Sequence, residues 1–249
     1  MSQTAERAGI TTEEEWAYRR QLAVMCRMVG MQGSIGMFGH LSLRIPKTEL
    51  VLITPGAGAE KTEVRADQIF IYDINGAILF HPGGDRPMTI PAEFRIHTQI
   101  HRDRPEMMGV AHLHSQWSTL LGVVNRPIVP AFNQGFMFGA GVPTWDNPAL
   151  VLNDEMAASL SRALGDKLAC QMRGHGSVVL GETAEACFMN CTAIEDNAKM
   201  QVMAEPFGGP VPFAPEYLQR AMQTRGMLEV AKAVWRFWEH KVETQGIPL

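Results

Sequence analysis

The order of short hydrophobic runs limits what this chain can fold into. Four β-like runs come first, and turn signals such as Ile74-Asn75-Gly76 separate them: LSLRI, LVLIT, IFIYD and AILF. Short runs joined by tight turns are typical of an antiparallel meander. From Pro91 onward, helical periodicity alternates with further β-like runs, so the sheet must continue between helices.

The remaining elements extend this pattern. We expect a strand at 107–114, a strand-like run at 127–132, and two strands on either side of Arg173 to Gly176. Helical periodicity predicts helices at 13–30, 91–103, 115–122 and 153–164, and from Thr183 and Pro215 onward. The pattern predicts an α/β fold, a three-layer α/β/α domain with a central mixed, largely antiparallel sheet.

The chain is long enough for one large core. Its 249 residues are 46% hydrophobic and 19% charged, which fits a single domain spanning 1–249. We expect the domain core at about 15–205 and a C-terminal helical extension at about 206–249.

Composition argues against two classes of partner. The formal net charge of -4 gives no basic excess for binding nucleic acid or an anionic membrane surface. There is no run of the roughly 20 apolar residues that a spanning helix needs. The polar, acidic start does not resemble a signal peptide, so we expect a cytoplasmic protein.

Three histidines form the strongest chemical pattern. His112 and His114 are two apart in an expected strand, so both imidazoles project from the same face and can reach one ion. Taken alone, they are equally consistent with two ordinary histidines at a strand end. His175 lies between two glycines, which permit unusual turn angles and close approach of a ligand. Three imidazoles around a divalent ion would leave positions open for substrate.

Glu93 stands near the expected start of the helix at 91–103. A carboxylate there is favoured by the helix dipole, so it can simply stabilise the helix start. Beside a divalent cation it can instead ligate the metal or act as a general acid or base. A competing zinc site is formed by Glu93, His97 and His101, which are spaced four apart on one helix face. The apolar residues between them favour a packed helix in which His97 bonds within the core.

Four motifs occur in order along the chain: GHLSLR at 39–44, LITPG at 52–56, the Pro-x-Glu segment that ends at Glu93, and HLH followed later by His175. With these motifs the chain resembles the class II aldolase and adducin-head family over about residues 15–205. The resemblance implies one divalent metal per subunit, manganese or zinc with ferrous iron as an alternative, bound by His112, His114 and His175. Glu93 would be the fourth ligand or the catalytic carboxylate. It also implies a homo-oligomer, a tetramer or larger, with sites near subunit interfaces.

The departures from that family narrow the reaction. Its sugar-phosphate aldolases carry asparagine where this chain has His40, and hydroxyl side chains where it has Gly56 and Pro91-Ala92. A phosphate dianion needs several donors to offset its desolvation, so a phosphorylated substrate is disfavoured. The aldolases also use a tyrosine as proton donor, and Gln134 aligns there.

The altered motif looks similar to the branch that decarboxylates hydroxylated aromatic or pyridine carboxylic acids, including dicarboxylates. In that hypothesis the metal chelates a carboxylate and an adjacent hydroxyl, and Glu93 or His40 protonates the ring carbon. His40 can otherwise just bond within its loop. We expect the substrate to contact Ser42, Arg44, Thr54 and Gly56. Arg44 would bind a second carboxylate through two hydrogen bonds, or else form a surface or intersubunit ion pair.

Three other functions stay open. An aldolase acting on an unphosphorylated hydroxy-keto acid or sugar-like substrate would need the same histidines. An iron-dependent oxygenase is a more distant alternative. A non-enzymatic interaction module is the third, but adducin-like members lack the full histidine set, so its retention here favours an enzyme.

Overall fold

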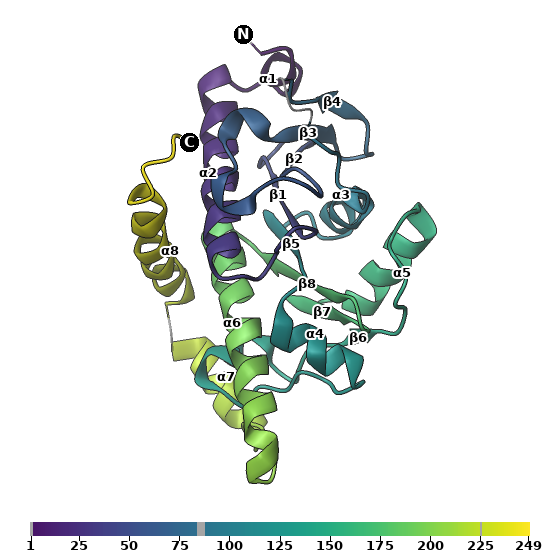
Figure 1. Cartoon of the computed structure of the whole chain (residues 1–249), viewed down its shortest axis with the longest axis vertical. Coiled ribbons are helices and arrows are strands. Elements are labelled where there is room, and N and C mark those ends of the chain that lie inside the picture. The colour runs from purple at the N-terminus through teal and green to yellow at the C-terminus, as the bar shows by residue number, and fades with distance from the viewer. Residues whose placement is uncertain (1, 84–87, 225) are drawn as a thin grey trace.

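A computed structural model describes residues 2–83, 88–224 and 226–249, and Figure 1 shows their arrangement. The described strands form one eight-stranded sheet in the order β4-β3-β2-β1-β5-β8-β7-β6. Neighbouring strands are antiparallel except β6 and β7, which run parallel. The strands are β1 (His40–Arg44), β2 (Leu50–Ile53), β3 (Phe70–Asp73), β4 (Ile78–Phe80), β5 (Gly109–Leu113), β6 (Thr144–Trp145), β7 (Ala169–Met172) and β8 (Gly176–Gly181). The expected mixed, largely antiparallel sheet is confirmed.

Apart from the start of α3 (Phe94–Asp103), the helices begin and end close to their expected positions. In the second helix, Thr11 accepts a hydrogen bond from the Glu14 amide and the Glu14 carboxylate accepts one from the Thr11 amide, a reciprocal cap that fixes the helix start. The α-helices are α1 (Gln3–Ala8), α2 (Thr12–Met31), α3 (Phe94–Asp103), α4 (Gln116–Val123), α5 (Asp154–Leu164), α6 (Ala184–Ala204), α7 (Pro215–Thr224) and α8 (Met227–Glu243). Short 3₁₀ turns are η1 (Lys61–Glu63), η2 (Ala66–Gln68), η3 (Asn133–Phe138) and η4 (Glu205–Phe207).

Helices cover both faces of the sheet. On one side α2, α6 and α8 pack against Leu41 and Leu43 of β1 and Leu113 of β5. On the other side α3 and α5 pack against Val110 of β5 and Val178 of β8 (Figure 1). The alternation of side chains along each strand thus buries hydrophobic residues on both faces of the sheet, and the three-layer α/β/α architecture is confirmed.

Residues 127–132 differ from the expected strand and make only one isolated bridge. Pro127 and Pro130 have no amide hydrogen to donate to a neighbouring strand. The amide of Val129 donates instead to the side chain of Gln201 at 3.0 Å, and two further amides of the segment donate to Asn197. Side chains of α6 therefore replace the strand partner, and an irregular path results.

Strand pairing brings the chemically interesting residues to the middle of the sheet. His40 of β1 lies directly opposite His112 of β5, so their side chains project from the same face. β8, which follows His175, pairs with the other edge of β5. No helix in the described part of the chain combines the length and the apolar character needed to cross a bilayer.

Candidate metal centre

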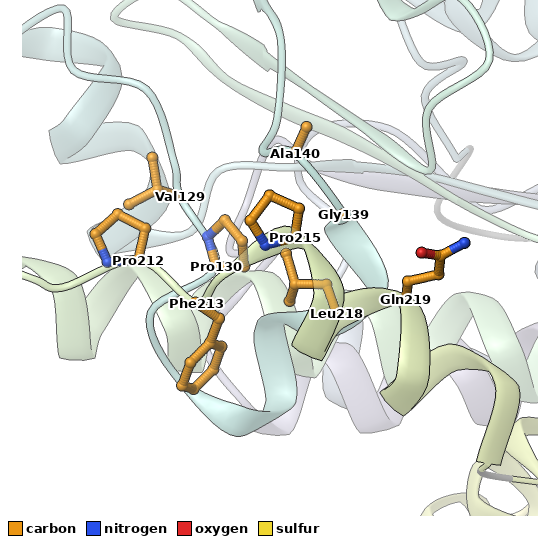
Figure 2. A pocket seen from close by; sticks show the side chains of 9 residues that line it. All are labelled: Val129, Pro130, Gly139, Ala140, Pro212, Phe213, Pro215, Leu218 and Gln219. Atoms are coloured by element: carbon orange, nitrogen blue, oxygen red, sulfur yellow. The ribbon is translucent and has the colours of Figure 1, made fainter.

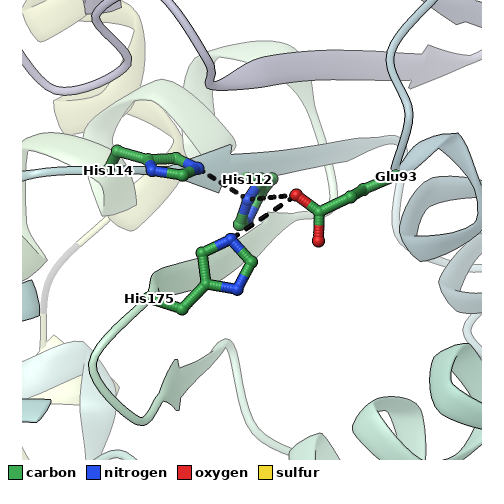
Figure 3. A group of neighbouring side chains, drawn as sticks. All are labelled: Glu93, His112, His114 and His175. Atoms are coloured by element: carbon green, nitrogen blue, oxygen red, sulfur yellow. Dashed lines mark hydrogen bonds and ion pairs between the residues drawn. The ribbon is translucent and has the colours of Figure 1, made fainter. Parts of the chain in front are cut away.

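Glu93, His112, His114 and His175 converge at one end of the central strands (Figure 3). Their potential ligand atoms all lie within 4.8 Å of one another. His112 projects from β5, His114 follows the end of that strand, His175 lies in the turn between β7 and β8, and Glu93 immediately precedes α3. The fold thus brings together the residues that the sequence singled out.

The atoms of this group fit a divalent cation. His112 Nε2 lies 2.9 Å from His114 Nε2, and Glu93 Oε2 lies 3.4 Å from Nε2 of both His112 and His175. Among the described residues, Nδ1 of His175 is buried without a partner, and Nε2 faces only the Glu93 carboxylate. Buried polar atoms rarely stay unpaired, and three imidazole nitrogens with one carboxylate oxygen are a typical ligand set for zinc or manganese.

Two glycines shape the turn that carries His175. Gly174 adopts a φ of +66°, which side-chain-bearing residues rarely adopt. At Gly176 an added Cβ would lie 2.2 Å from the carbonyl oxygen of Leu113, because β8 approaches β5 closely there. The expected unusual angle is found at Gly174, and the close approach found at Gly176 is that of the β5 backbone. Close approach of a ligand stays a prediction.

We expect Gly176→Ala to destabilise the fold by about 1–3 kcal/mol, since the new methyl group must push β8 away from β5. The turn that holds His175 would move with it, so metal content should also fall. Urea denaturation measures the first effect. Gly83→Ala is the matched control, because a Cβ there meets nothing within 4 Å. Equal stability of the two variants would contradict this account of the turn.

The expected helix start at Pro91 is wrong: α3 begins at Phe94, and Glu93 occupies its N-cap position.

Both carboxylate oxygens of Glu93 make contacts with other residues. Its Oε1 accepts a hydrogen bond from the amide of Val151 at 2.8 Å, which leaves Oε2 for the histidines. Burial alone would raise the pKa of this carboxyl, but the contacts with His112 and His175 outweigh burial and lower the pKa below its ordinary value. Nothing in the sequence indicated the contact with Val151.

The loop after β2 supports the segment that carries Glu93. Thr54 is buried, and its hydroxyl accepts a hydrogen bond from the amide of Leu41 at 3.0 Å. A Cβ on Gly56 would lie 2.9 Å from backbone atoms of Pro91, so the backbone of the loop packs directly against the backbone of the segment before Glu93. Lys61, which no sequence motif indicated, is buried and donates to the Gly56 carbonyl at 2.8 Å. Substrate contacts of Thr54 and Gly56 stay predictions.

His40 lies beside the candidate metal group, which consists of Glu93, His112, His114 and His175. Its ring centroid is 5.0 Å from that of His112, and its Nδ1 lies 2.6 Å from Nε2 of His97. Burial and the neighbouring imidazoles hold the pKa of His40 well below its usual value. Burial, with a smaller contribution from the nearby histidines, lowers the pKa of His114 to about 3. Neutral imidazoles are the form that binds metal ions.

The competing zinc site of Glu93, His97 and His101 does not form. His97 Nδ1 lies 2.7 Å from the hydroxyl of Ser42, and His101 Nε2 lies 2.9 Å from the same hydroxyl. Both histidines are fully buried. The sequence indicated that His97 could bond within the core, but it gave no sign that the partners would be His40 and Ser42.

Ser42 and Arg44 are placed further from the metal group than His40. Ser42 is 0% exposed, and its hydroxyl is engaged by His97 and His101. Arg44 follows His40 by four strand residues, about 13 Å at ordinary strand rise, and donates to the carbonyl oxygens of Thr48 and His101. These placements do not favour the expected substrate contacts, which stay predictions.

Comparison with known proteins identifies the family. The model of the class II aldolase and adducin N-terminal domain matches residues 20–202. The chain belongs to this family. Among its curated relatives, a 3,4-dihydroxyphthalate decarboxylase from Arthrobacter keyseri is 28% identical over 227 residues, covering 88% of this chain and 91% of the relative. Another 3,4-dihydroxyphthalate decarboxylase, from Terrabacter, is 29% identical over 203 residues, covering 78% and 83% of the two chains.

Solved structures show the same class II aldolase fold. An aldolase II superfamily protein from Pseudomonas syringae superposes with a TM-score of 0.83 at 22% identity, covering 94% of this chain and 95% of the other. An L-fuculose 1-phosphate aldolase from Glaciozyma antarctica gives a TM-score of 0.83 at 19% identity, covering 96% and 95%. The same fold therefore occurs in a protein named as an aldolase, while two of the sequence relatives are named as decarboxylases.

A cavity beside α7 is lined by none of Glu93, His112, His114 and His175. It has a volume of about 520 Å³ and lies beside α7 (Figure 2). The lining residues are Val129, Pro130, Gly139, Ala140, Pro212, Phe213, Pro215, Leu218 and Gln219. None of these residues is titratable, so this apolar cavity offers no group for acid–base or metal chemistry.

Proposed function

We propose that this protein is a divalent-metal-dependent lyase that decarboxylates a hydroxylated aromatic or heteroaromatic carboxylic acid or dicarboxylic acid. The observation that carries this proposal is the position of His40, a buried imidazole beside the metal group. The relatives named as 3,4-dihydroxyphthalate decarboxylases support the same reaction class.

His112, His114, His175 and Glu93 would hold the ion, with manganese or zinc as the first candidates and ferrous iron as the alternative. A bound divalent ion supplies a Lewis acid that orients the substrate carboxylate and its adjacent hydroxyl and stabilises the negative charge that develops there. Glu93 suits the role of ligand, because Val151 fixes one of its oxygens and the histidines surround the other.

His40 suits the proton transfers. In the reaction the ring carbon that bears the carboxylate gains a proton, its bond to the carboxylate breaks, and the bonding electrons return to the ring as carbon dioxide leaves. One proton from solvent is consumed in each turnover. His40 can take the proton of the substrate hydroxyl and deliver a proton to the ring carbon, with Glu93 as the alternative donor.

Carbon dioxide release from a panel of substrates tests the proposal. We expect release from 3,4-dihydroxyphthalate or another ortho-hydroxylated aromatic carboxylic acid, and none from phthalate, which lacks the chelating hydroxyl. Activity should disappear when the metal is removed with a chelator and return when manganese or zinc is added. Pyruvate or an aldehyde formed from a hydroxy-keto acid, with no carbon dioxide from any aromatic acid, would establish the aldolase alternative instead.

The surface beside the centre supports a homo-oligomer, which we propose is a tetramer or larger. Met37 and Phe38 are each 56% exposed, and the Phe38 ring centroid lies 6.2 Å from that of His114. Apolar side chains exposed beside a reactive centre fit a surface that a second subunit covers, although a bound ligand can cover such a surface too.

A further inference from the structure

A continuous row of buried hydrogen bonds runs from His40 to a backbone carbonyl. His40 Nδ1 lies 2.6 Å from His97 Nε2, and His97 Nδ1 lies 2.7 Å from Ser42 Oγ. Ser42 Oγ lies 2.9 Å from His101 Nε2, and His101 Nδ1 lies 3.2 Å from the carbonyl oxygen of Met107. All of these side chains are buried, and the row crosses from β1 to α3 and back.

The hydrogen bond to Met107, at the end of the row away from His40, determines which nitrogen of His101 carries a hydrogen. A carbonyl oxygen can only accept, so His101 Nδ1 must donate its hydrogen to Met107. Burial, with a smaller contribution from the charge of Arg44, lowers the pKa of His101 to about 3, and the ring is therefore neutral. A neutral ring carries one hydrogen, so His101 Nε2 is an acceptor, and Ser42 donates its hydroxyl hydrogen to it at 2.9 Å in preference to the Val110 carbonyl oxygen at 3.4 Å.

Each later link follows from the one before. Ser42 has used its only hydrogen, so its oxygen accepts from His97, and His97 Nδ1 is the protonated nitrogen. The other nitrogen of His97, Nε2, then accepts from His40, which places a hydrogen on His40 Nδ1. His40 is only 2% exposed, and a buried imidazole is neutral unless it has a charged partner. Its single hydrogen is then the one on Nδ1.

We propose that His97, Ser42 and His101 are positioning residues that hold His40 in the tautomer with Nδ1 protonated and Nε2 free to accept a proton. This inference deepens the proposed function, and its consequence for catalysis rests on that function. Ser42 thereby has a role through His40 in place of the expected contact with substrate. The hydrogen bond at one imidazole nitrogen decides which form the other takes.

The fixed tautomer assigns the order of proton transfers. His40 Nε2 first forms a bond to the hydroxyl proton of the substrate, and the O–H electrons stay on oxygen. The charged ring is stabilised by its bond to His97 Nε2, which accepts from Nδ1 in both states. Nε2 then returns a proton to the ring carbon as the carboxylate bond breaks, and His40 is neutral again. Solvent supplies the proton that restores the product hydroxyl.

Nitrogen-15 NMR of the ring nitrogens tests the tautomer without any turnover. The probe is the full chain loaded with zinc, which is diamagnetic, with ¹⁵N-labelled histidine and His40→Ala to assign the signals. We expect His40 to show a protonated Nδ1 and an unprotonated Nε2. A protonated Nε2 with a bare Nδ1 in the wild-type protein would overturn the proposal.

Three variants connect the tautomer to the reaction. Ser42→Ala interrupts the row, so the His40 signals should shift toward a mixture of tautomers, with kcat roughly tenfold lower and with KM and zinc content unchanged. Ser42→Thr keeps the hydroxyl and should restore the wild-type tautomer and most of kcat. Ile100→Val removes one buried methyl group from α3 without touching the row, and it controls for the loss of stability.

The outcomes separate this inference from the proposed function. Wild-type tautomer and kcat in Ser42→Ala would show that the row does not act on His40. If Ser42→Ala does not fold, the wild-type spectrum still decides the tautomer. If no aromatic acid releases carbon dioxide, the proposed reaction fails, whereas the spectrum of His40 still tests the positioning role.

Discussion

Replacing His112 and His114 together with alanine is expected to abolish metal binding and to lower turnover by at least about 1,000-fold. Two of the four proposed ligands disappear, and Glu93 and His175 alone cannot hold a divalent ion against competition from water. Metal analysis of the purified variant gives the ion stoichiometry, and carbon dioxide release gives the rate.

The matched control removes two histidines elsewhere. His81→Ala with His240→Ala changes two exposed imidazoles that lie outside the metal group, and we expect its metal content and turnover to stay normal. Stoichiometric metal in the His112 and His114 variant would contradict the assignment of the centre. A metal-free wild-type protein that keeps its fold and shows no activity would favour the non-enzymatic interaction module.

The metal group could be predicted because its signals are local. His112 and His114 share one face of a strand whenever the strand forms, since side chains alternate. The glycines around His175 point to a turn of unusual geometry whatever it faces. The family motifs then supply the link between segments more than 60 residues apart, which spacing alone does not give.

The supporting contacts could not be predicted, because they depend on how elements pack in three dimensions. His97 faces His40 only once α3 lies across β1 and β5, and the four-residue spacing of Glu93, His97 and His101 also allowed a competing zinc site. The run at 127–132 has a strand-like composition, but the bonds from its amides to α6 were not visible in the local sequence. Such contacts between distant segments override local propensity.

Glu93→Gln is expected to lower turnover by about 100-fold or more, even when the metal is supplied in excess. The amide keeps the shape of the side chain and can still accept from Val151, so the fold should survive. The substitution removes the negative charge beside His112 and His175, however, and with it one of the proposed ligands. Carbon dioxide release across a series of metal concentrations measures the effect.

Glu155→Gln is the control for Glu93→Gln, because Glu155 is an exposed carboxylate on α5 and its loss should leave turnover unchanged. The metal series also separates the two roles of Glu93. A ligand that only increases affinity can be compensated by a higher metal concentration, whereas a charge that acts in the reaction cannot. Turnover of Glu93→Gln that returns to the wild-type level with excess metal would therefore restrict Glu93 to metal binding, and would leave His40 as the group that moves the proton.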